Sequence, residues 1–270
     1  MFVQPLTHPS ATFDRISRIV KYITLDETIR IYRMANVLET IITVVVGTIN
    51  GVTTTVRDGV AAVEDFIYVR FSGMPFIVLG ARQVGKTTLI EWLKRNMDDI
   101  EGYKTNPTGA GGDAVPDFTA KVGDTHFKLK PSRDVGGEYA MWETDWVELF
   151  RETKPRGIIF MIDHTEPYLQ KDALNFVLQM IEDEATSAKG IRAFYILVNK
   201  QDIWGEYMEL DEIMGHYKNE QKRLRAQAER LGYKYAITYG SLYTGKGVKA
   251  MMKSFFNTLR PKPRDIKDTD

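Results

Sequence analysis

From residue 75 onward, apolar residues alternate between two patterns. Short uninterrupted apolar runs, rich in β-branched residues, are typical of strands buried on both faces of a sheet. They lie near residues 75–79, 158–163 and 194–198. Stretches with apolar residues at helical spacing follow these runs, near residues 87–97, 168–186 and 211–231. Strands that alternate with helices predict an α/β fold built on a mainly parallel sheet.

A different pattern precedes this part of the chain. Between Val37 and Ile67, apolar residues recur in steps of three, four and four. This spacing keeps one apolar stripe nearly straight along an α-helix. The stripe consists of Leu38, Ile41, Val45, Ile49, Val52, Val56, Val60, Val63 and Ile67. Because valine, threonine and glycine are weak helix formers, such a helix would need a surface to lie on.

Four interpretations of this stripe stay open. It packs on the domain that follows, pairs with another copy of the chain, lies on a membrane surface, or spans a membrane. The segment from Val37 to Ile67 contains no lysine, which argues against strong attraction to anionic lipids. The uncharged stretch Thr40–Val56 is only just long enough to span a membrane and contains six threonines.

These patterns divide the chain into three parts. Residues 1–70 are expected to form a helical extension that binds a membrane or a partner, with a first helix at Asp14–Met34. Residues 71–260 are expected to form one α/β domain, with Phe71–Pro75 as the hinge. Residues 261–270 are polar and contain prolines, so we expect a flexible tail.

Composition narrows the functions that are open to this chain. Its 270 residues include 36 Lys and Arg and 36 Asp and Glu, and a net charge of zero argues against general binding to nucleic acid. There is no cysteine, which excludes disulfides and thiolate metal sites. The first residues lack the basic-then-apolar order of a secretory signal. We therefore expect a cytoplasmic protein, with peripheral membrane attachment as an alternative.

The sequence GARQVGKTT, from Gly80 to Thr88, matches the phosphate-loop pattern G-x-x-x-x-G-K-[ST]. Its glycines let backbone N–H groups wrap a phosphate without a Cβ in the way. Lys86 would reach the β- and γ-phosphates, and the Thr87 hydroxyl would coordinate Mg²⁺. The strand before the loop and the helix after it are the context that this motif requires. The predicted phosphate-binding residues are Gly80, Gln83, Val84, Gly85, Lys86, Thr87 and Thr88.

A second loop predicts which base is bound. The apolar run at 194–198 ends in the four residues NKQD. The carboxylate of Asp202 can accept hydrogen bonds from both N1–H and the 2-amino group of guanine, and adenine offers neither donor. We expect Asn199 to brace the neighbouring loops and the Lys200 stem to cover one face of the base.

A third loop, GSLYTGKG, follows the helical stretch at 211–231 and a further strand. We expect it to complete the base site, with Ser241 and Leu242 where a backbone N–H meets the guanine oxygen. An ordinary strand-to-helix loop that contains glycines is the alternative.

The segment KPSRDVGGE, which ends at Glu138, carries the expected metal and switch residues. Asp134 would hold Mg²⁺ through a water, and Thr108 is the candidate for the second hydroxyl ligand. Gly137 would donate its N–H to the γ-phosphate and lose that bond on hydrolysis, which releases the segment behind it. The glycines around Thr108 also fit a plain flexible loop.

Together these motifs resemble those of Ras-like GTPases, and most of all the ADP-ribosylation-factor branch. The resemblance covers residues 75–259 and rests on GKTT, NPTG, DVGGE, GIIFMIDHTE and NKQD. It implies a P-loop GTPase fold, with a mainly parallel six-stranded sheet and helices on both faces. It also implies Mg²⁺, GTP and GDP as substrate and product, a protein effector or regulator, and catalytic roles for Lys86, Gly137 and the residue at position 138.

The chain departs from that family at three positions. Glu138 stands where the family has a glutamine that orients the attacking water. A carboxylate cannot donate to the developing charge and would repel the γ-phosphate, so we expect slow hydrolysis. Three roles are open for Arg82. It could act as an arginine finger in cis, it could block the approach of an arginine finger from a partner, or it could be a solvated residue of the loop. Pro131 interrupts the basic strand expected before Asp134.

Two functions fit these residues. The first is a GTP-hydrolysing switch that its extension places on a membrane or a partner in one nucleotide state. The second is a GTP-binding scaffold with little turnover that assembles through its extension. The residues Glu138 and Arg82 are the reason why this second function is considered. An ATPase is a third function, and it would require that Asp202 does not select the base.

Overall fold

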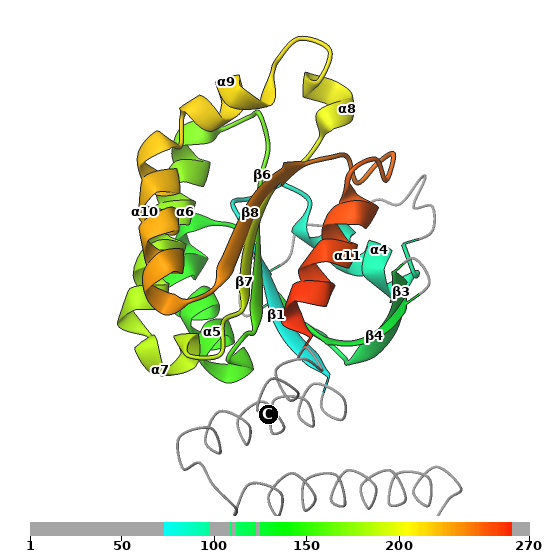
Figure 1. Ribbon diagram of the computed structural model, residues 1–270, viewed down its shortest axis with the longest axis vertical. Coiled ribbons are helices and arrows are strands. Elements are labelled where there is room, and N and C mark those ends of the chain that lie inside the picture. The colour runs from blue at the N-terminus through cyan, green and yellow to red at the C-terminus, as the bar shows by residue number, and fades with distance from the viewer. Residues whose placement is uncertain (1–72, 98–108, 110–111, 123–124, 261–270) are drawn as a thin grey trace, which may run out of the picture. The chain divides into compact units, whose positions relative to one another are not determined.

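The computed structural model describes residues 73–97, 109, 112–122 and 125–260 (Figure 1). All of them belong to one compact unit, Asp65–Arg264. The expected helices of the extension, Phe71 and Ser72 of the expected hinge, the tail and Thr108 lie outside the described residues. The hinge expected at Phe71–Pro75 is wrong at its end, because Met74 and Pro75 belong to the strand β1, Met74–Leu79.

Six strands form the central sheet in the order β3-β4-β1-β6-β7-β8. Every neighbouring pair is parallel except β3 and β4. The strands are β1 Met74–Leu79, β3 Phe118–Val122, β4 Thr125–Lys130, β6 Gly157–Ile162, β7 Ala193–Val198 and β8 Lys234–Tyr239. The three central strands β1, β6 and β7 are buried along their whole length, which explains their uninterrupted apolar sequences. The mainly parallel six-stranded sheet is therefore confirmed.

A separate antiparallel ribbon pairs β2, Asp113–Val115, with β5, Ser132–Asp134. Pro131 lies between β4 and β5 and has no N–H to continue the ladder. Ser132 follows it in a left-handed conformation with φ 67°. The chain thus leaves the large sheet at Pro131, yet β5 still contacts β1 and α4, the helix Lys86–Lys94.

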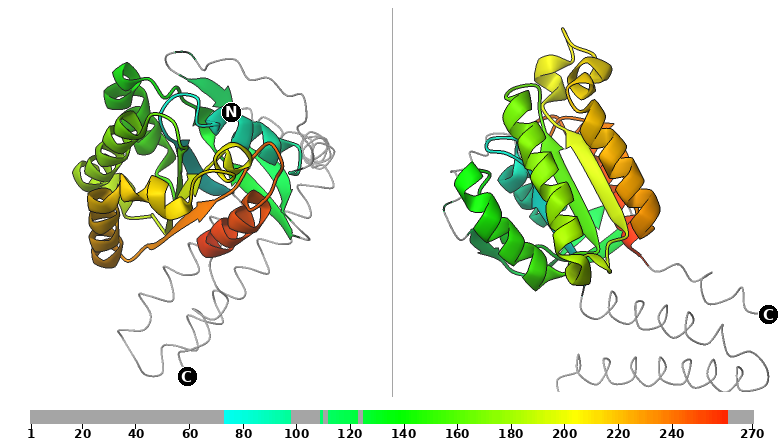
Figure 2. Two further views of the ribbon diagram at one scale, coloured as in Figure 1. Left: turned by 90° about the horizontal axis from the view of Figure 1, so that it is seen from above. Right: turned by 90° about the vertical axis from the view of Figure 1, so that its left-hand side faces the viewer.

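Helices cover both faces of the sheet (Figure 2). Phe76 and Val78 of β1 pack in one core with α4 and with α11, Val248–Leu259. Ile77 and Leu79 pack in the other core with α5, Val147–Thr153, α6, Pro167–Asp183, and α10, Lys218–Leu231. This alternation is the period of two that a strand imposes on its side chains. The remaining α-helices are α7 Ala185–Ala188, α8 Gln201–Trp204 and α9 Leu210–Gly215.

The helical stretch expected at 211–231 is present, but it is divided between two helices, α9 and α10. α9 ends at Gly215, α10 begins at Lys218, and Tyr217 lies fully buried between them. The Tyr217 hydroxyl donates a hydrogen bond to Oε1 of Gln170 at 3.3 Å. Burial of this ring interrupts a helix that the pattern of apolar residues alone would continue.

Two other predicted helices end earlier than expected. The helix expected at 87–97 ends at Lys94, and Asn96 beyond it adopts a positive φ of 57°. The helix expected at 168–186 ends at Asp183 and is followed by the short helix α7. Neither difference moves a predicted site residue.

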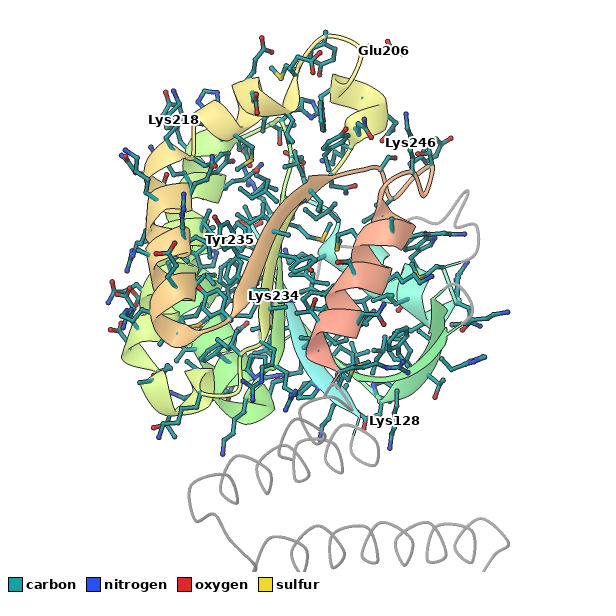
Figure 3. All side chains as sticks on the ribbon, in the orientation of Figure 1. Lys128, Glu206, Lys218, Lys234, Tyr235 and Lys246 are labelled. Carbon is teal, nitrogen blue, oxygen red and sulfur yellow. The ribbon has the colours of Figure 1, made fainter. Side chains whose placement is uncertain are left out.

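Charged side chains project from the outer surfaces of the helices, as Lys218 does at the start of α10 (Figure 3). Glu206 marks the loop after α8, the helix that follows β7, and Lys246 marks the loop after β8 (Figure 3). The site described below is built at the carboxyl ends of these two strands and of β1. Within the part of the chain described, no helix is both long and apolar enough to cross a membrane.

Candidate nucleotide-binding site

The loop between β1 and α4 lies at the carboxyl end of the parallel strands, where α/β sheets bind ligands. Gly80 and Gly85 have φ of 147° and 103°, which favour glycine. A Cβ at Gly80 would lie 2.4 Å from the Met161 carbonyl oxygen, and one at Gly85 would lie 2.7 Å from Nδ2 of Asn199. Both glycines are therefore required by close packing as well as by backbone conformation.

Lys86 is buried at the start of α4, with 7% of its surface exposed. Its Nζ donates a hydrogen bond to the Ala81 carbonyl oxygen at 3.0 Å, within the same loop. Burial lowers the pKa of Lys86 to about 8, although Asp134 and Glu138 partly offset this effect. A buried ammonium with little anionic compensation is suited to a ligand that brings negative charge, such as a phosphate.

The predicted metal residues Thr87 and Asp134 come from neighbouring elements. Thr87 and the neighbouring Thr88 lie partly buried in the first turn of α4, and Asp134 is buried at the end of β5, which contacts α4. Hydroxyl and carboxylate oxygens suit Mg²⁺, which is usually held by few protein ligands together with phosphate oxygens. Among the described residues, no group of three His, Asp or Glu could hold a metal ion. The donor set of Thr87 and Asp134 fits an Mg²⁺ ion that phosphate oxygens of a nucleotide also bind.

Gly137 lies directly against the phosphate loop. A Cβ at this position would lie 2.3 Å from the Ala81 carbonyl carbon and 2.4 Å from the Arg82 nitrogen. Glu138 follows it and is exposed, and its charge acts on Arg82 and Lys86. The structure thus brings the expected switch segment into contact with the phosphate loop.

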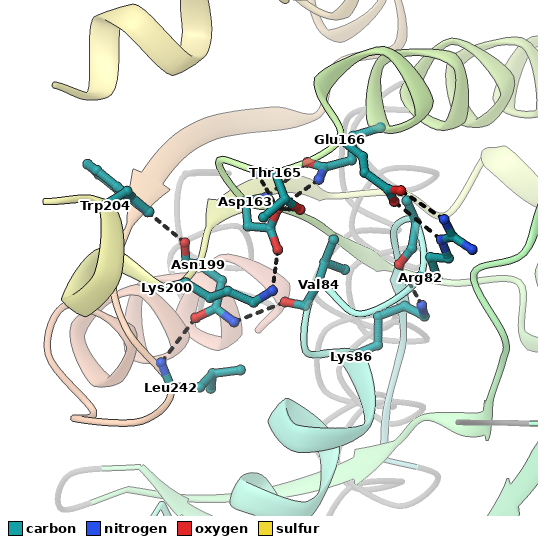
Figure 4. A network of polar contacts seen from close by, with 12 residues as sticks. Arg82, Val84, Lys86, Asp163, Thr165, Glu166, Asn199, Lys200, Trp204 and Leu242 are labelled. Carbon is teal, nitrogen blue, oxygen red and sulfur yellow. Dashed lines mark hydrogen bonds and ion pairs between the residues drawn. The ribbon is translucent and has the colours of Figure 1, made fainter. Parts of the chain in front are cut away.

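Arg82 is engaged by an acidic neighbour. Its guanidinium forms an ion pair with Glu166, with Nη2 2.8 Å from Oε1, and both side chains remain nearly half exposed (Figure 4). Glu166 directly precedes α6, and the sequence patterns predicted no role for this residue. Of the three roles open for Arg82, a solvated loop residue fits this geometry best.

Asn199 connects three segments of the base side (Figure 4). Its side-chain Nδ2 donates to the Val84 carbonyl oxygen at 2.9 Å, and its Oδ1 accepts from the Leu242 N–H at 3.1 Å. Its backbone carbonyl accepts from the indole Nε1 of Trp204 at 2.7 Å. The phosphate loop, the NKQD loop and the later glycine-containing loop therefore meet at one buried amide.

Lys200 pairs with a residue to which the sequence assigned no role. Its Nζ lies 2.5 Å from Oδ2 of Asp163, which is only 1% exposed. Burial alone would raise the pKa of Asp163, but hydrogen bonds from Lys200, Thr165 and Gln170 outweigh it and hold this pKa below its usual value. The sequence offered one signal for Asp163, because it is a carboxylate that directly follows the apolar strand β6.

The remaining base-site residues differ in exposure. Asp202 is exposed in the first turn of α8, so its carboxylate is open to a ligand. Ser241 is buried, and its Oγ accepts a hydrogen bond from the Thr244 N–H at 3.1 Å. The Leu242 N–H, expected near the guanine oxygen together with Ser241, instead donates to Asn199.

A phosphate loop after β1 and an NKQD loop after β7, joined through one asparagine on a mainly parallel sheet, define a P-loop protein of the small-GTPase class. The model of the ADP-ribosylation factor family matches residues 65–259. The chain therefore belongs to this family of GTP-binding switch proteins.

A solved structure gives a more distant likeness. The Arl6 BBS3 small GTPase from Trypanosoma brucei, with bound nucleotide analogue GppNp, is 18% identical, with a TM-score of 0.44. The match covers 69% of this chain and 96% of that chain. No curated protein matches at a significant level.

Proposed function

We propose that the chain binds GTP and GDP together with Mg²⁺ and hydrolyses GTP slowly as a molecular switch. The observation that supports this most is the position of Asn199, which joins the phosphate loop at Val84 to the base loop at Leu242. A guanine base and its phosphates would then be bound by one connected site.

The phosphate side supplies the chemistry in this proposal. Lys86 and the amides of its loop would stabilise charge on the transferred phosphoryl group. Thr87, Thr108 and Asp134 would hold Mg²⁺, which neutralises phosphate charge when it is bound. Gly137 would donate its N–H to the γ-phosphate, so that this contact exists with GTP and not with GDP.

Selection of guanine by Asp202 is the step that a substitution tests most directly. We expect Asp202→Asn to weaken GTP and GDP binding by about 100-fold, because the asparagine amide accepts only one of the two guanine hydrogen bonds, carries no charge, and turns an N–H group toward the other donor. Equilibrium binding of fluorescent guanine and adenine nucleotides measures this change. Glu206→Gln removes another exposed carboxylate from the loop after α8 and should leave binding unchanged. Unchanged nucleotide preference in Asp202→Asn would favour the ATPase.

A scaffold with little turnover is the second candidate, and the exposed carboxylate of Glu138 is the observation that favours it. Glu138→Gln restores a group that can orient water and removes repulsion of the γ-phosphate. For a slow switch, we expect single-turnover hydrolysis to rise about tenfold or more over the natural chain, within the range of general acid–base effects. If neither form hydrolyses GTP, the scaffold is favoured.

We also propose that residues 37–67 dock the protein on a membrane surface or a protein partner, from a cytoplasmic location. The apolar stripe of that segment supports this proposal. Flotation with liposomes, of the full chain and of a form that begins at Phe71, with GTP analogue and with GDP, tests it. Absence of flotation in every state would favour packing against protein.

A further inference from the structure

Two tryptophans hold the backbone of the switch segment. The indole Nε1 of Trp146 donates to the Gly136 carbonyl oxygen at 2.8 Å, and that of Trp142 donates to the Gly137 carbonyl oxygen at 3.2 Å. Both tryptophans and both glycines are buried. Both carbonyl groups of the switch glycines are therefore hydrogen-bonded by side chains from the turn that follows them.

The indoles are themselves held in place. Trp142–Trp146 is a π-helical turn, a rare element that is frequently found at functional sites. The two rings stack with centroids 5.3 Å apart and an interplanar angle of 25°. Phe176 of α6 contacts both rings, with centroids 5.9 and 6.2 Å away. The donors are thus anchored to a long helix of the domain.

The bond from Trp146 also orients the opposite side of the same peptide. In a trans peptide the C=O and N–H groups point in opposite directions. An indole that holds the Gly136 carbonyl therefore directs the Gly137 N–H away from Trp146. Gly137 lies against Ala81 of the phosphate loop, where a Cβ would be 2.3 Å from the carbonyl carbon.

We propose that Trp146, supported by Trp142, is a positioning residue that aims the Gly137 N–H at the terminal phosphate of a nucleoside triphosphate. This proposal rests on the proposed binding of GTP and GDP. The two indoles then set how strongly the chain prefers triphosphate over diphosphate. They touch neither nucleotide and act only through the glycine backbone.

Replacing Trp146 by phenylalanine tests the role of the indole N–H separately from the role of the aromatic ring. Trp146→Phe keeps an aromatic side chain in the core but leaves the buried Gly136 carbonyl without its donor, so the peptide is no longer held in one orientation. We expect the affinity for a non-hydrolysable GTP analogue to fall about tenfold, the effect of one hydrogen bond to a charged group. GDP affinity should change less than about twofold, because GDP lacks the phosphate that Gly137 would contact.

The experiment measures equilibrium dissociation constants of GDP and the GTP analogue, with Mg²⁺, for the full chain and its variants. Trp92→Phe is the matched control, because Trp92 is equally buried but packs in the opposite core. Trp142→Phe should shift the ratio of the two constants in the same direction as Trp146→Phe, by about threefold, because its bond is longer.

Each outcome decides between two explanations. A selective loss of analogue binding in Trp146→Phe, with no selective loss in Trp92→Phe, supports the proposal. Equal loss for both nucleotides in Trp146→Phe and Trp142→Phe, or no loss in either, overturns it, since the indoles would then serve folding alone. If the natural chain binds neither nucleotide, the proposed function itself fails, and that result is separate from any variant.

Discussion

On the base side, the hydrogen bonds of Asn199 reach Val84 and Leu242, which lie 115 and 43 residues away in the sequence. On the phosphate side, the carbonyls of Gly136 and Gly137 are held by indoles only ten and five residues further along. Long-range bonds of the first kind require the whole domain to be folded. Local bonds of the second kind can break and re-form while the domain stays intact.

This difference fits the two tasks of a switch. The base is the same in GTP and GDP, so its loops need not rearrange between the two states. The terminal phosphate is present in only one of them, and the segment that senses it must change position at small free-energy cost. This arrangement predicts that substitutions on the base side weaken the binding of GTP and GDP equally. Substitutions around Gly137 should instead weaken the binding of GTP more than that of GDP.

After Asp202, the largest effect of a substitution is expected at Asn199. Asn199→Ala removes two buried hydrogen bonds and leaves the Val84 carbonyl and Leu242 N–H unpaired, so we expect the free energy of unfolding to fall by about 2–3 kcal/mol. If about 2 kcal/mol of this also weakens binding, GTP and GDP affinities fall together by about 30-fold. Chemical denaturation and nucleotide titration measure these two quantities.

Asn175→Ala is the matched control. Asn175 donates from Nδ2 to Oε1 of Glu220 at 2.8 Å, between α6 and α10 and outside the site. We expect it to lower stability without weakening nucleotide binding beyond about twofold, since one partly buried hydrogen bond is lost. Selective loss of GTP alone in Asn199→Ala would contradict the view that the base side is shared by both states.

The frame of this molecule follows from local patterns in the sequence. The runs near 75–79, 158–163 and 194–198 each became a central strand because parallel strands are buried on both faces. The motif GKTT then fell at the start of α4, and NKQD followed β7, because each motif adjoins such a run. Local sequence is sufficient where one element and its adjacent loop determine the position of a residue.

Contacts between distant segments could not be predicted in the same way. The pairing of Lys200 with Asp163 depends on β6 and β7 being neighbours, and the break at Tyr217 depends on a contact with Gln170. Such contacts depend on which strands and helices become neighbours, and a single sequence does not contain this information directly. The ion pair of Arg82 with Glu166 was missed for the same reason.

A smaller effect is expected at Asp163. Asp163→Asn keeps the shape but removes the charge that pairs with Lys200, whose side chain is 28% exposed. We expect the free energy of unfolding at pH 7 to fall by about 2 kcal/mol, less than for a fully buried pair. Binding of GTP and GDP should weaken together, because the Lys200 stem would no longer be held in place.

The difference in the free energy of unfolding between the natural chain and Asp163→Asn should depend on pH in a definite direction. Hydrogen bonds lower the pKa of Asp163 in the folded state below the unfolded value of about 3.9. The stability from its charge is therefore complete above that unfolded value and is lost as the pH falls through the folded pKa. Urea unfolding of the natural chain and of Asp163→Asn should show a constant difference in the free energy of unfolding from pH 7 to about pH 5. Below about pH 4 this difference should become smaller. A difference that grows on acidification would contradict this pairing.

The smallest effect is expected at Arg82, although it lies in the phosphate loop. Its partner Glu166 is nearly half exposed, and exposed ion pairs of this kind contribute little to stability. We expect Arg82→Ala and Glu166→Ala to leave the melting temperature and single-turnover hydrolysis nearly unchanged, within about twofold for the rate, because a solvated pair touches no reacting atom. A cis arginine finger would behave differently, since such residues contribute several orders of magnitude to turnover. Loss of hydrolysis in Arg82→Ala, together with a gain in Glu166→Ala, would mean that Glu166 withholds Arg82 from the γ-phosphate. The phosphate side would then contain a second movable group besides Gly137, and its difference from the braced base side would be larger than the present contacts indicate.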